Sequence, residues 1–271
     1  MERFGPAGHG GRGDAAPPRI RLGGIGIDRV DEQQAVARVL DALESGRGGQ
    51  IVTPNVDIVA AARRSSELRA LIEAADLVVA DGAPLVWASR LAGTPLPERV
   101  AGSDLVWSLS VAASERGLRI ALLGGTPDGA ARPTERAAAV LEERYPGLKA
   151  VGAWCPPMGF EHDDSHWSAL VDRLDAAAPD LVYVGLGFPK QEQVMARLGA
   201  VAPRAWFLGC GASIDFIAGY RRRAPEWMRR SGTEWLFRLA SEPGRLARRY
   251  LLDDVPEALR LLAEAARSRR S

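Results

Sequence analysis

Three polar residues follow two apolar segments in a pattern that could support transfer chemistry. In "VVADGAP", Asp81 follows the last apolar residues of an expected strand, at the point where the strand passes into a helix. Its carboxylate could cap that helix, or it could act as a general base that deprotonates an acceptor hydroxyl. Thr53 and Asn55 in "VTPNVD" follow a neighbouring apolar run. Capping is the favoured interpretation for both, and binding of a sugar hydroxyl is the alternative.

Glycine-rich turns supply a second kind of candidate site. "LLGGTPDG" contains Gly124 and Gly125, and "LGCGAS" contains Gly211. Glycine lets backbone N–H groups approach a phosphate at a helix N-terminus, although tight turns alone would also explain these residues. Gln191 lies in "GLGFPKQEQ", a polar turn after an apolar strand. No complete dinucleotide fingerprint or P-loop is present, so neither NAD nor ATP is indicated.

A metal site and a nucleophilic cysteine are both disfavoured. His162 and His166 in "EHDDSH" are four residues apart, but a third convincing ligand is missing and the stretch reads as a polar loop. Cys155 and Cys210 are the only two cysteines. They are expected to be packing or turn residues, and they indicate no disulfide framework.

A basic and aromatic segment lies near the C-terminus. "EWLFRLASEPGRLARRY", residues 234–250, alternates bulky apolar side chains with arginines that include Arg238, Arg245 and Arg248. Such a segment could be a core helix with a charged outer face or a nucleic-acid patch. It could also be a membrane-surface helix whose arginine forks bind a diphosphate. The residues alone leave these alternatives open.

The elements that would position these residues alternate along the chain. Apolar runs of strand length are separated by helical patterns, which predicts an α/β, Rossmann-like, mostly parallel sheet flanked by helices, with a helical C-terminal appendage. The expected strands are 50–53, 76–82, 119–125, 148–154, 180–187 and 204–211, after a strand or small hairpin at 19–28. The expected helices are 31–44, 56–75, 84–93, 128–145, 189–199 and 212–219, with Pro133 near a helix start or at a kink. Ligands of such sheets bind beyond the carboxyl ends of the strands, where the candidate residues fall.

Composition is typical of a globular protein, with 46% apolar and 25% charged residues and a net charge of +1. Near-neutral charge argues against wholesale nucleic-acid binding. No run is long enough to span a bilayer and the N-terminus lacks a signal-peptide core, which favours a soluble or peripheral protein. With only two cysteines and no disulfide framework, a cytoplasmic location is expected. Four segments are expected: a disordered tail at 1–18, the α/β domain at 19–220, an Arg/Trp-rich appendage at 221–252 and a C-terminal helix or tail at 253–271.

Six stretches taken in order resemble the WecG/TagA/CpsF family of bacterial glycosyltransferases (glycosyltransferase family 26). They are "TPNVDIV", "ADLVVADGAPLVWASRLAGTPLPERVAGSDL", "LLGGTPDGA", "VGLGFPKQE", "GASIDFIAG" and "RRAPEWMRRSGTEWLFRLASEPGRLARRYL". The resemblance covers about Ile20 to Leu251. The second and last stretches are the most specific.

The resemblance implies an inverting transfer of a sugar from a UDP-sugar to a polyprenyl-diphosphate-linked saccharide at the cytoplasmic face of the membrane. Family members add, for example, N-acetylmannosamine or its uronic acid during teichoic acid and surface polysaccharide assembly, without a metal or other cofactor. By motif, Asp81 resembles the catalytic base, Thr53 and Asn55 resemble acceptor- and sugar-side residues, and Gln191 lies in the matching turn. Arg238, Arg245 and Arg248 resemble appendage arginines that meet the diphosphate, so the appendage is expected to be both a membrane surface and a diphosphate clamp.

Specificity and partners stay open at this point. Residues 154–158 depart from the histidine-containing or aromatic stretch of many relatives, so the donor could carry N-acetylmannosamine, its uronic acid or another hexose or hexuronic acid. A nucleotide-sugar-binding scaffold without transferase activity is the alternative function. An apolar appendage could be covered by the membrane or by a second copy in a homo-oligomer. No nucleic-acid partner is expected.

Overall fold

A single parallel sheet forms the centre of the molecule. The computed structural model describes residues 19–125, 132–225, 227–228, 233–241, 244, 248 and 250–269, without the side chains of Arg238 and Leu251. In spatial order, the six strands are β4 (Leu77–Val78), β3 (Gly49–Val52), β8 (Trp206–Gly209), β7 (Leu181–Gly185), β5 (Arg119–Gly124) and β6 (Lys149–Trp154). Every pairing between them is parallel. The predicted α/β class and parallel sheet are confirmed.

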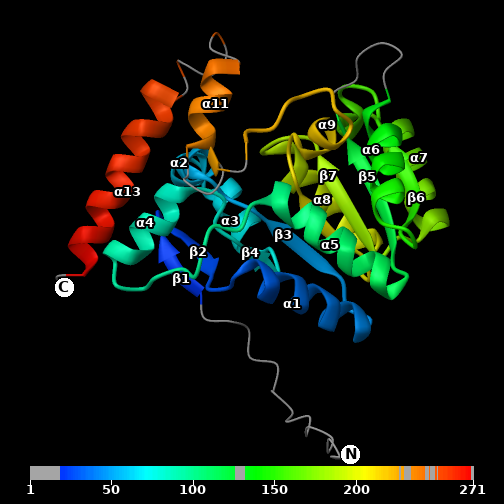
Figure 1. Ribbon diagram of the computed structural model, residues 1–271, viewed down its shortest axis with the longest axis horizontal. Helices are drawn as coiled ribbons and strands as arrows, with labels where there is room; N and C mark the ends of the chain where they lie inside the picture. Colours follow the sequence, from blue (N-terminus) through cyan, green and yellow to red (C-terminus); the bar gives the residue numbers. More distant parts are fainter. Residues whose placement is uncertain are drawn as a thin grey trace, which may run out of the picture.

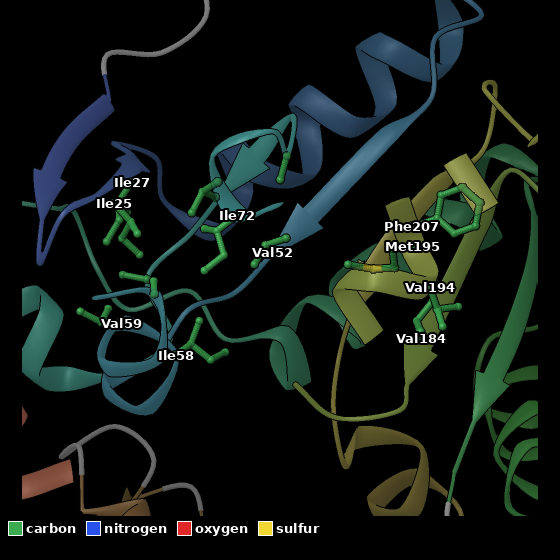
Figure 2. Packing of buried hydrophobic residues seen from close by; sticks show 14 of the residues in the cluster. Ile25, Ile27, Val52, Ile58, Val59, Ile72, Val184, Val194, Met195 and Phe207 are labelled. Carbon is green, nitrogen blue, oxygen red and sulfur yellow. The ribbon is translucent and has the colours of Figure 1, made fainter. Parts of the chain in front are cut away.

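The strands have apolar residues on both faces because helices cover both sides. In β7, Val182 and Val184 belong to one buried cluster, whereas Leu181 and Tyr183 belong to the other. Alternation with a period of two therefore divides each strand between two cores, as in other parallel sheets buried on both faces. Figure 2 shows part of the first cluster, in which Val184 and Phe207 of the sheet pack with Val194 and Met195.

Helices on the two faces have separate sets of buried side chains. Those that contribute to the first cluster are α2 (Val56–Arg64), α3 (Ser66–Glu73), α4 (Ala83–Leu91), α7 (Asp164–Ala177) and α8 (Lys190–Val201). Those that contribute to the second are α1 (Glu32–Glu44), α5 (Gly102–Arg116), α6 (Pro133–Arg144) and α9 (Ser213–Ile217). The result is a three-layer arrangement with the sheet in the middle (Figure 1).

The structure differs from the sequence-based expectation in four elements. The predicted helix at 56–75 is interrupted at Ser65, whose extended backbone and side chain cap α3. Helix α6 begins at Pro133, and residues 128–131 of its predicted span lie outside the described residues. Helices α5 and α7 were not predicted. The polar run at 161–166 was expected to be a loop, but it forms η1 (Phe160–His162) and the start of α7.

The segment at 19–28 is the predicted small hairpin. Strands β1 (Arg19–Leu22) and β2 (Ile25–Asp28) pair antiparallel and form a sheet of their own. The buried carboxylate of Asp28 accepts a hydrogen bond of 2.7 Å from the backbone N–H of Val78. This bond ties the hairpin to the end of β4 and thereby supports the edge of the sheet that carries Asp81.

The C-terminal elements return to that same edge. They are α11 (Glu234–Ser241), the π-helical turn η2 (Tyr250–Asp254) and α13 (Val255–Ser268). Helix α13 lies beside α4 and buries Leu261 and Ala265 in the first cluster (Figure 1). Arg63 of α2 forms ion pairs with Glu257 and Glu264 of α13. None of the helices in the described part of the chain is long and apolar enough to cross a membrane.

Candidate active site

A pocket of about 540 Å³ opens at the carboxyl ends of β3, β4 and β8. Its wall on the sheet side includes five predicted site residues, namely Thr53, Asn55, Asp81, Gln191 and Gly211. Its opposite wall comes from the C-terminal elements, through Trp235, Tyr250, Val255 and Ala258. The volume is in the range of pockets that hold a small organic ligand.

Asp81 lines the pocket and does not cap a helix. The N-cap of α4 is Gly82, which makes no side-chain cap bond, so the capping interpretation of Asp81 is wrong. The Asp81 backbone N–H donates to the carbonyl of Pro54, which joins the ends of β3 and β4. Its carboxylate Oδ1 accepts a hydrogen bond of 3.2 Å from Arg99 Nη1, and the side chain is 30% exposed to the pocket side.

Arg99 links Asp81 to three other parts of the site. Its Nη2 donates to Asp104 Oδ2 at 3.0 Å, and its Nη1 lies 3.9 Å from Glu234 Oε2 of α11. Burial alone would lower the pKa of Arg99, but the charges of Asp81, Asp104 and Glu234 outweigh it, so the pKa is raised. Asp104 also accepts from Arg223 at 2.7 Å. The five charged groups form one network from the pocket to the start of the appendage.

Sequence reasoning did not single out Arg99. The sequence does contain a hint of its role. Arg99 lies in "ERVAGSDL", within one of the most specific stretches of the resemblance, and it is the second basic residue after Asp81, following Arg90 of α4. Its pairing partners are 18, 5 and 135 positions away along the chain, and the sequence pattern does not specify such pairs. Trp235 and Tyr250 are among the bulky apolar residues of the segment 234–250, but the sequence does not predict their place in the pocket wall. Their rings meet edge to face at a centroid distance of 6.3 Å.

The neighbouring polar residues have defined partners. Asn55 caps α2, because its Oδ1 accepts from the backbone N–H of Ile58 at 3.0 Å, as its capping interpretation predicts. Thr53 is buried, and its Oγ1 lies 3.4 Å from the carbonyl oxygen of Gly209 at the end of β8. Both residues also line the pocket, so the cap at Asn55 leaves a role in binding untested.

Gln191 connects α8 to the turn after β8. Its Oε1 accepts from the backbone N–H of Gly211 at 3.1 Å, and its Nε2 donates to Glu192 Oε1 at 2.9 Å. Gly211 has a φ of +53°, a left-handed conformation that suits glycine. This turn therefore has its backbone N–H directed at a side chain of α8.

Gly124 and Gly125 lie outside this pocket. A Cβ atom on Gly124 would stand 2.4 Å from the carbonyl oxygen of Gly185, so the close approach of β5 and β7 accounts for that glycine. Neither residue is among those that line the pocket. The turn continues into residues 126–131, which lie outside the described part of the chain. Phosphate binding by Gly124 and Gly125 stays a prediction.

The predicted arginine clamp is only partly described. Arg238 belongs to α11, but its side chain lies outside the described part of the structure. Arg245 lies wholly outside it. Arg248 is exposed and does not line the pocket. Among the described lining residues, Asp57, Asp81, Glu234 and Asp254 are acidic, whereas Arg99 and Arg221 are basic. Arg221 pairs with Asp215 at 3.6 Å.

His162, His166 and the two cysteines form no alternative site within the part of the chain that the structure describes. His162 belongs to η1 and His166 to α7, so they do not share one helix face, and Asp163 caps α7. In the described residues no cluster of three or more His, Cys, Asp or Glu could hold a metal ion. Burial raises the pKa of the Cys210 thiol to about 12, and burial also raises that of Cys155. Neither thiol would provide a thiolate nucleophile at neutral pH.

Comparison with known proteins identifies the family. A model of the glycosyl transferase WecG/TagA/CpsF family matches residues 20–271. This chain belongs to the WecG/TagA/CpsF family of glycosyltransferases. The match includes α13, so it extends beyond the end near Leu251 that the sequence motifs indicate.

A curated relative shares much of the chain. It is the N-acetylglucosaminyldiphosphoundecaprenol N-acetyl-beta-D-mannosaminyltransferase of Bacillus spizizenii (strain ATCC 23059 / NRRL B-14472 / W23). The two sequences are 32% identical over 206 residues, which cover 76% of each chain. The WecG/TagA/CpsF protein described here is thus a glycosyltransferase, and its Rossmann-like sheet carries the pocket described above.

Proposed function

We propose that this WecG/TagA/CpsF protein is an inverting transferase that moves a hexose-type sugar from a UDP-sugar to a polyprenyl-diphosphate-linked saccharide. The sugar is of the N-acetylmannosamine type, its uronic acid, or another hexose or hexuronic acid. The relative's name supports the first of these and an N-acetylglucosaminyl-diphosphate lipid acceptor. The observation that carries the proposal is the placement of Asp81 in the pocket at the strand ends, beside Thr53 and Asn55.

In this proposal Asp81 is the general base. Its carboxylate takes the proton from an acceptor hydroxyl while that oxygen attacks the anomeric carbon from the face opposite the diphosphate. The new bond joins the acceptor oxygen to the anomeric carbon, the bond from that carbon to the phosphate oxygen breaks, and UDP leaves with the electron pair. Arg99 holds the Asp81 carboxylate in one orientation through the 3.2 Å hydrogen bond. Thr53 and Asn55 are proposed to contact the acceptor or donor sugar.

The leaving diphosphate requires cations that the described pocket supplies only in part. Arg99 is shared by three carboxylates and Arg221 is paired with Asp215. Because the remaining charged groups of the described lining are acidic, further cations are needed to stabilise the departing charge. We assign this task to Arg238, Arg245 and Arg248 of the appendage. For Arg238 this role accords with the position of α11 at the pocket wall.

The appendage is also proposed to contact the cytoplasmic face of the membrane. Trp227 is 67% exposed, Trp235 45% and Leu236 43%. Tryptophan prefers the headgroup level of a bilayer, and basic residues add attraction to anionic lipids. The same segment would then bring the pocket to the lipid-linked acceptor.

The test is UDP release from a panel of UDP-sugars with a polyprenyl-diphosphate-linked N-acetylglucosamine acceptor in detergent or liposomes. Acceptor-dependent release from one donor, lost in Asp81→Asn and retained in the exposed control Asp175→Asn, supports both the reaction and the base. Release that survives Asp81→Asn removes the base assignment. Binding of UDP-sugars without release from any donor by the wild type would contradict transfer to this acceptor and favour the alternative of a nucleotide-sugar-binding scaffold.

A further inference from the structure

A buried carboxyl group lies directly behind the pocket wall, and the transfer chemistry above does not use it. Glu192 is 1% exposed and is the third residue of α8, which begins at Lys190. Its Oε1 accepts the hydrogen bond from Gln191 Nε2, whereas its Oε2 is buried without a hydrogen-bond partner among the described residues. A buried carboxyl group with a hydrogen bond to only one of its two oxygens lowers the free energy of unfolding, so a functional reason for its presence is expected.

The partner of Glu192 faces the pocket. Gln191 is 4% exposed, and its amide fills the space beside Gly209, where a Cβ atom would lie 2.8 Å from Nε2. The amide oxygen of Gln191 receives the Gly211 N–H, and the amide nitrogen donates to Glu192. Reversing the amide would set its NH₂ group against the Gly211 N–H and its oxygen against a carboxylate oxygen. Glu192 and Gly211 therefore specify the same orientation of Gln191 from two sides.

This orientation leaves one hydrogen of the Gln191 amide uncommitted. A carboxamide nitrogen carries two hydrogens, and only the bond to Glu192 is formed within the described part of the chain. The second hydrogen belongs to a side chain that lines the pocket. A donor fixed on both sides is preorganised for an acceptor atom on a ligand, whereas a freely rotating amide would lose rotational freedom on binding.

We propose that Glu192 is a positioning residue, whose carboxyl group orients the Gln191 amide as a hydrogen-bond donor to substrate and thereby holds the Gly211 turn at the pocket floor. The proposal rests on the proposed function, because the substrate is a ligand of this pocket. It assigns Glu192 no contact with substrate. Two consequences follow from the proposal. The effects of substitutions at residues 191 and 192 on kcat/KM should not add, and loss of the Glu192 carboxyl group should loosen the backbone at Gly211.

The test compares Glu192→Met, which keeps the volume but removes the acceptor, with Glu192→Gln, whose amide oxygen can still accept from Gln191. Gln193→Met, at an exposed position of the same helix, is the matched control. We expect Glu192→Met to lose about tenfold or more in kcat/KM, as when a buried hydrogen-bond donor is left without its partner, and Glu192→Gln to retain most of it. Adding Glu192→Met to Gln191→Ala should cause little further loss, because both changes remove one interaction.

A second measurement is independent of turnover. Hydrogen exchange at the Gly211 amide should be faster in Glu192→Met than in the wild type, and unchanged in Gln193→Met. Full activity and unchanged Gly211 exchange in Glu192→Met would overturn the proposal, as would losses that simply add in the double variant. If the wild type transfers none of the offered sugars, the proposed function fails, but the exchange measurement still decides whether Glu192 positions Gln191.

Discussion

Arg99 Nη1 lies 3.2 Å from Asp81 Oδ1, and the same guanidinium also contacts Asp104 and approaches Glu234 of α11. The proposed base is thus linked to the appendage through one cation. A change in the position of α11 would alter the charge around Arg99 and, through it, the carboxylate that faces the pocket. This link gives a physical route by which docking of the appendage affects catalysis.

Replacing Arg99 should therefore impair transfer even though Asp81 is untouched. We expect Arg99→Met to lower kcat/KM by roughly ten- to a hundredfold, because Asp81 and Asp104 lose a charged hydrogen-bond partner. Arg99→Lys should recover only part of the loss, since lysine cannot contact both carboxylates with a rigid fork. Arg90→Met, an exposed arginine on α4, is the control for loss of a positive charge. Equal rates for Arg99→Met and wild type would contradict the link.

The sequence predicts the sheet well because strands such as β5, β7 and β8 are apolar on both faces and pass into glycine-containing turns. The run 180–187 predicts a buried strand, and Thr53 and Asp81 lie beyond the carboxyl ends of β3 and β4, as the rule for parallel sheets predicts. Gln191 reaches the same pocket from the first turn of α8. Pairings across the chain were not predictable in the same way. The contact of Arg99 with Glu234 and the docking of α13 on Arg63 depend on the tertiary arrangement.

Local propensity also explains the elements that were predicted wrongly. The polar run at 161–166 contains two aspartates that suggest a loop, yet Asp163 accepts hydrogen bonds from the backbone N–H groups of Ser165 and His166 and begins α7. Aspartate is favoured at turns and at N-caps for the same reason, so residue type alone does not separate them. The break at Ser65 is a similar case, because its side chain caps a second helix.

Arg63 should be important for stability because it holds α13 against α2. Its guanidinium pairs with Glu257 and Glu264, and α13 buries Leu261 in the same region. Arg63→Met should lower the free energy of unfolding by about 1–3 kcal/mol, because two partly buried carboxylates lose their partner. Arg64→Met, at the next and exposed position, should change it little. Urea unfolding of both variants measures the difference, and equal midpoints would show that α13 is held by apolar contacts alone.

Because of this anchoring, a cut near Arg221 would not leave the α/β core intact. Such a cut also removes Leu261 and Ala265, which are buried in the first cluster of the core. Point variants in the appendage are therefore the sharper test of its role.

Membrane binding should depend on Trp227, the more exposed of the two appendage tryptophans. We expect Trp227→Ser to reduce partitioning into anionic phosphatidylglycerol vesicles by roughly tenfold, in line with the loss of one large apolar side chain at an interface. Met158→Ser is a matched control, because Met158 is 83% exposed and follows β6 at the opposite edge of the sheet. Co-sedimentation at two salt concentrations measures both variants. An equal loss in the two would indicate non-specific adsorption and contradict a dedicated surface.

Glu192 should also give the protein a distinctive dependence of stability on pH. Burial raises the pKa of its carboxyl group to about 7 from an ordinary value of 4.5. The folded state therefore holds this proton more tightly than the unfolded chain does. Across about pH 4.5 to 7 the contribution of Glu192 to the free energy of unfolding falls as pH rises, and above pH 7 the loss is complete. Its upper limit is roughly 3 kcal/mol, from about 1.4 kcal/mol for each pKa unit.

The difference between Glu192→Gln and wild type isolates this contribution, because every other titrating group is shared. The variant should gain stability relative to the wild type as pH rises from 5 to 8, whatever the offset at pH 5. Glu143→Gln, an exposed glutamate of α6, is the control and should show no such trend. Thermal unfolding at four pH values in this range measures all three proteins. A constant difference between Glu192→Gln and wild type would mean that Glu192 keeps an ordinary pKa in the folded protein, and its carboxylate would then be fully charged when it orients Gln191 at pH 7.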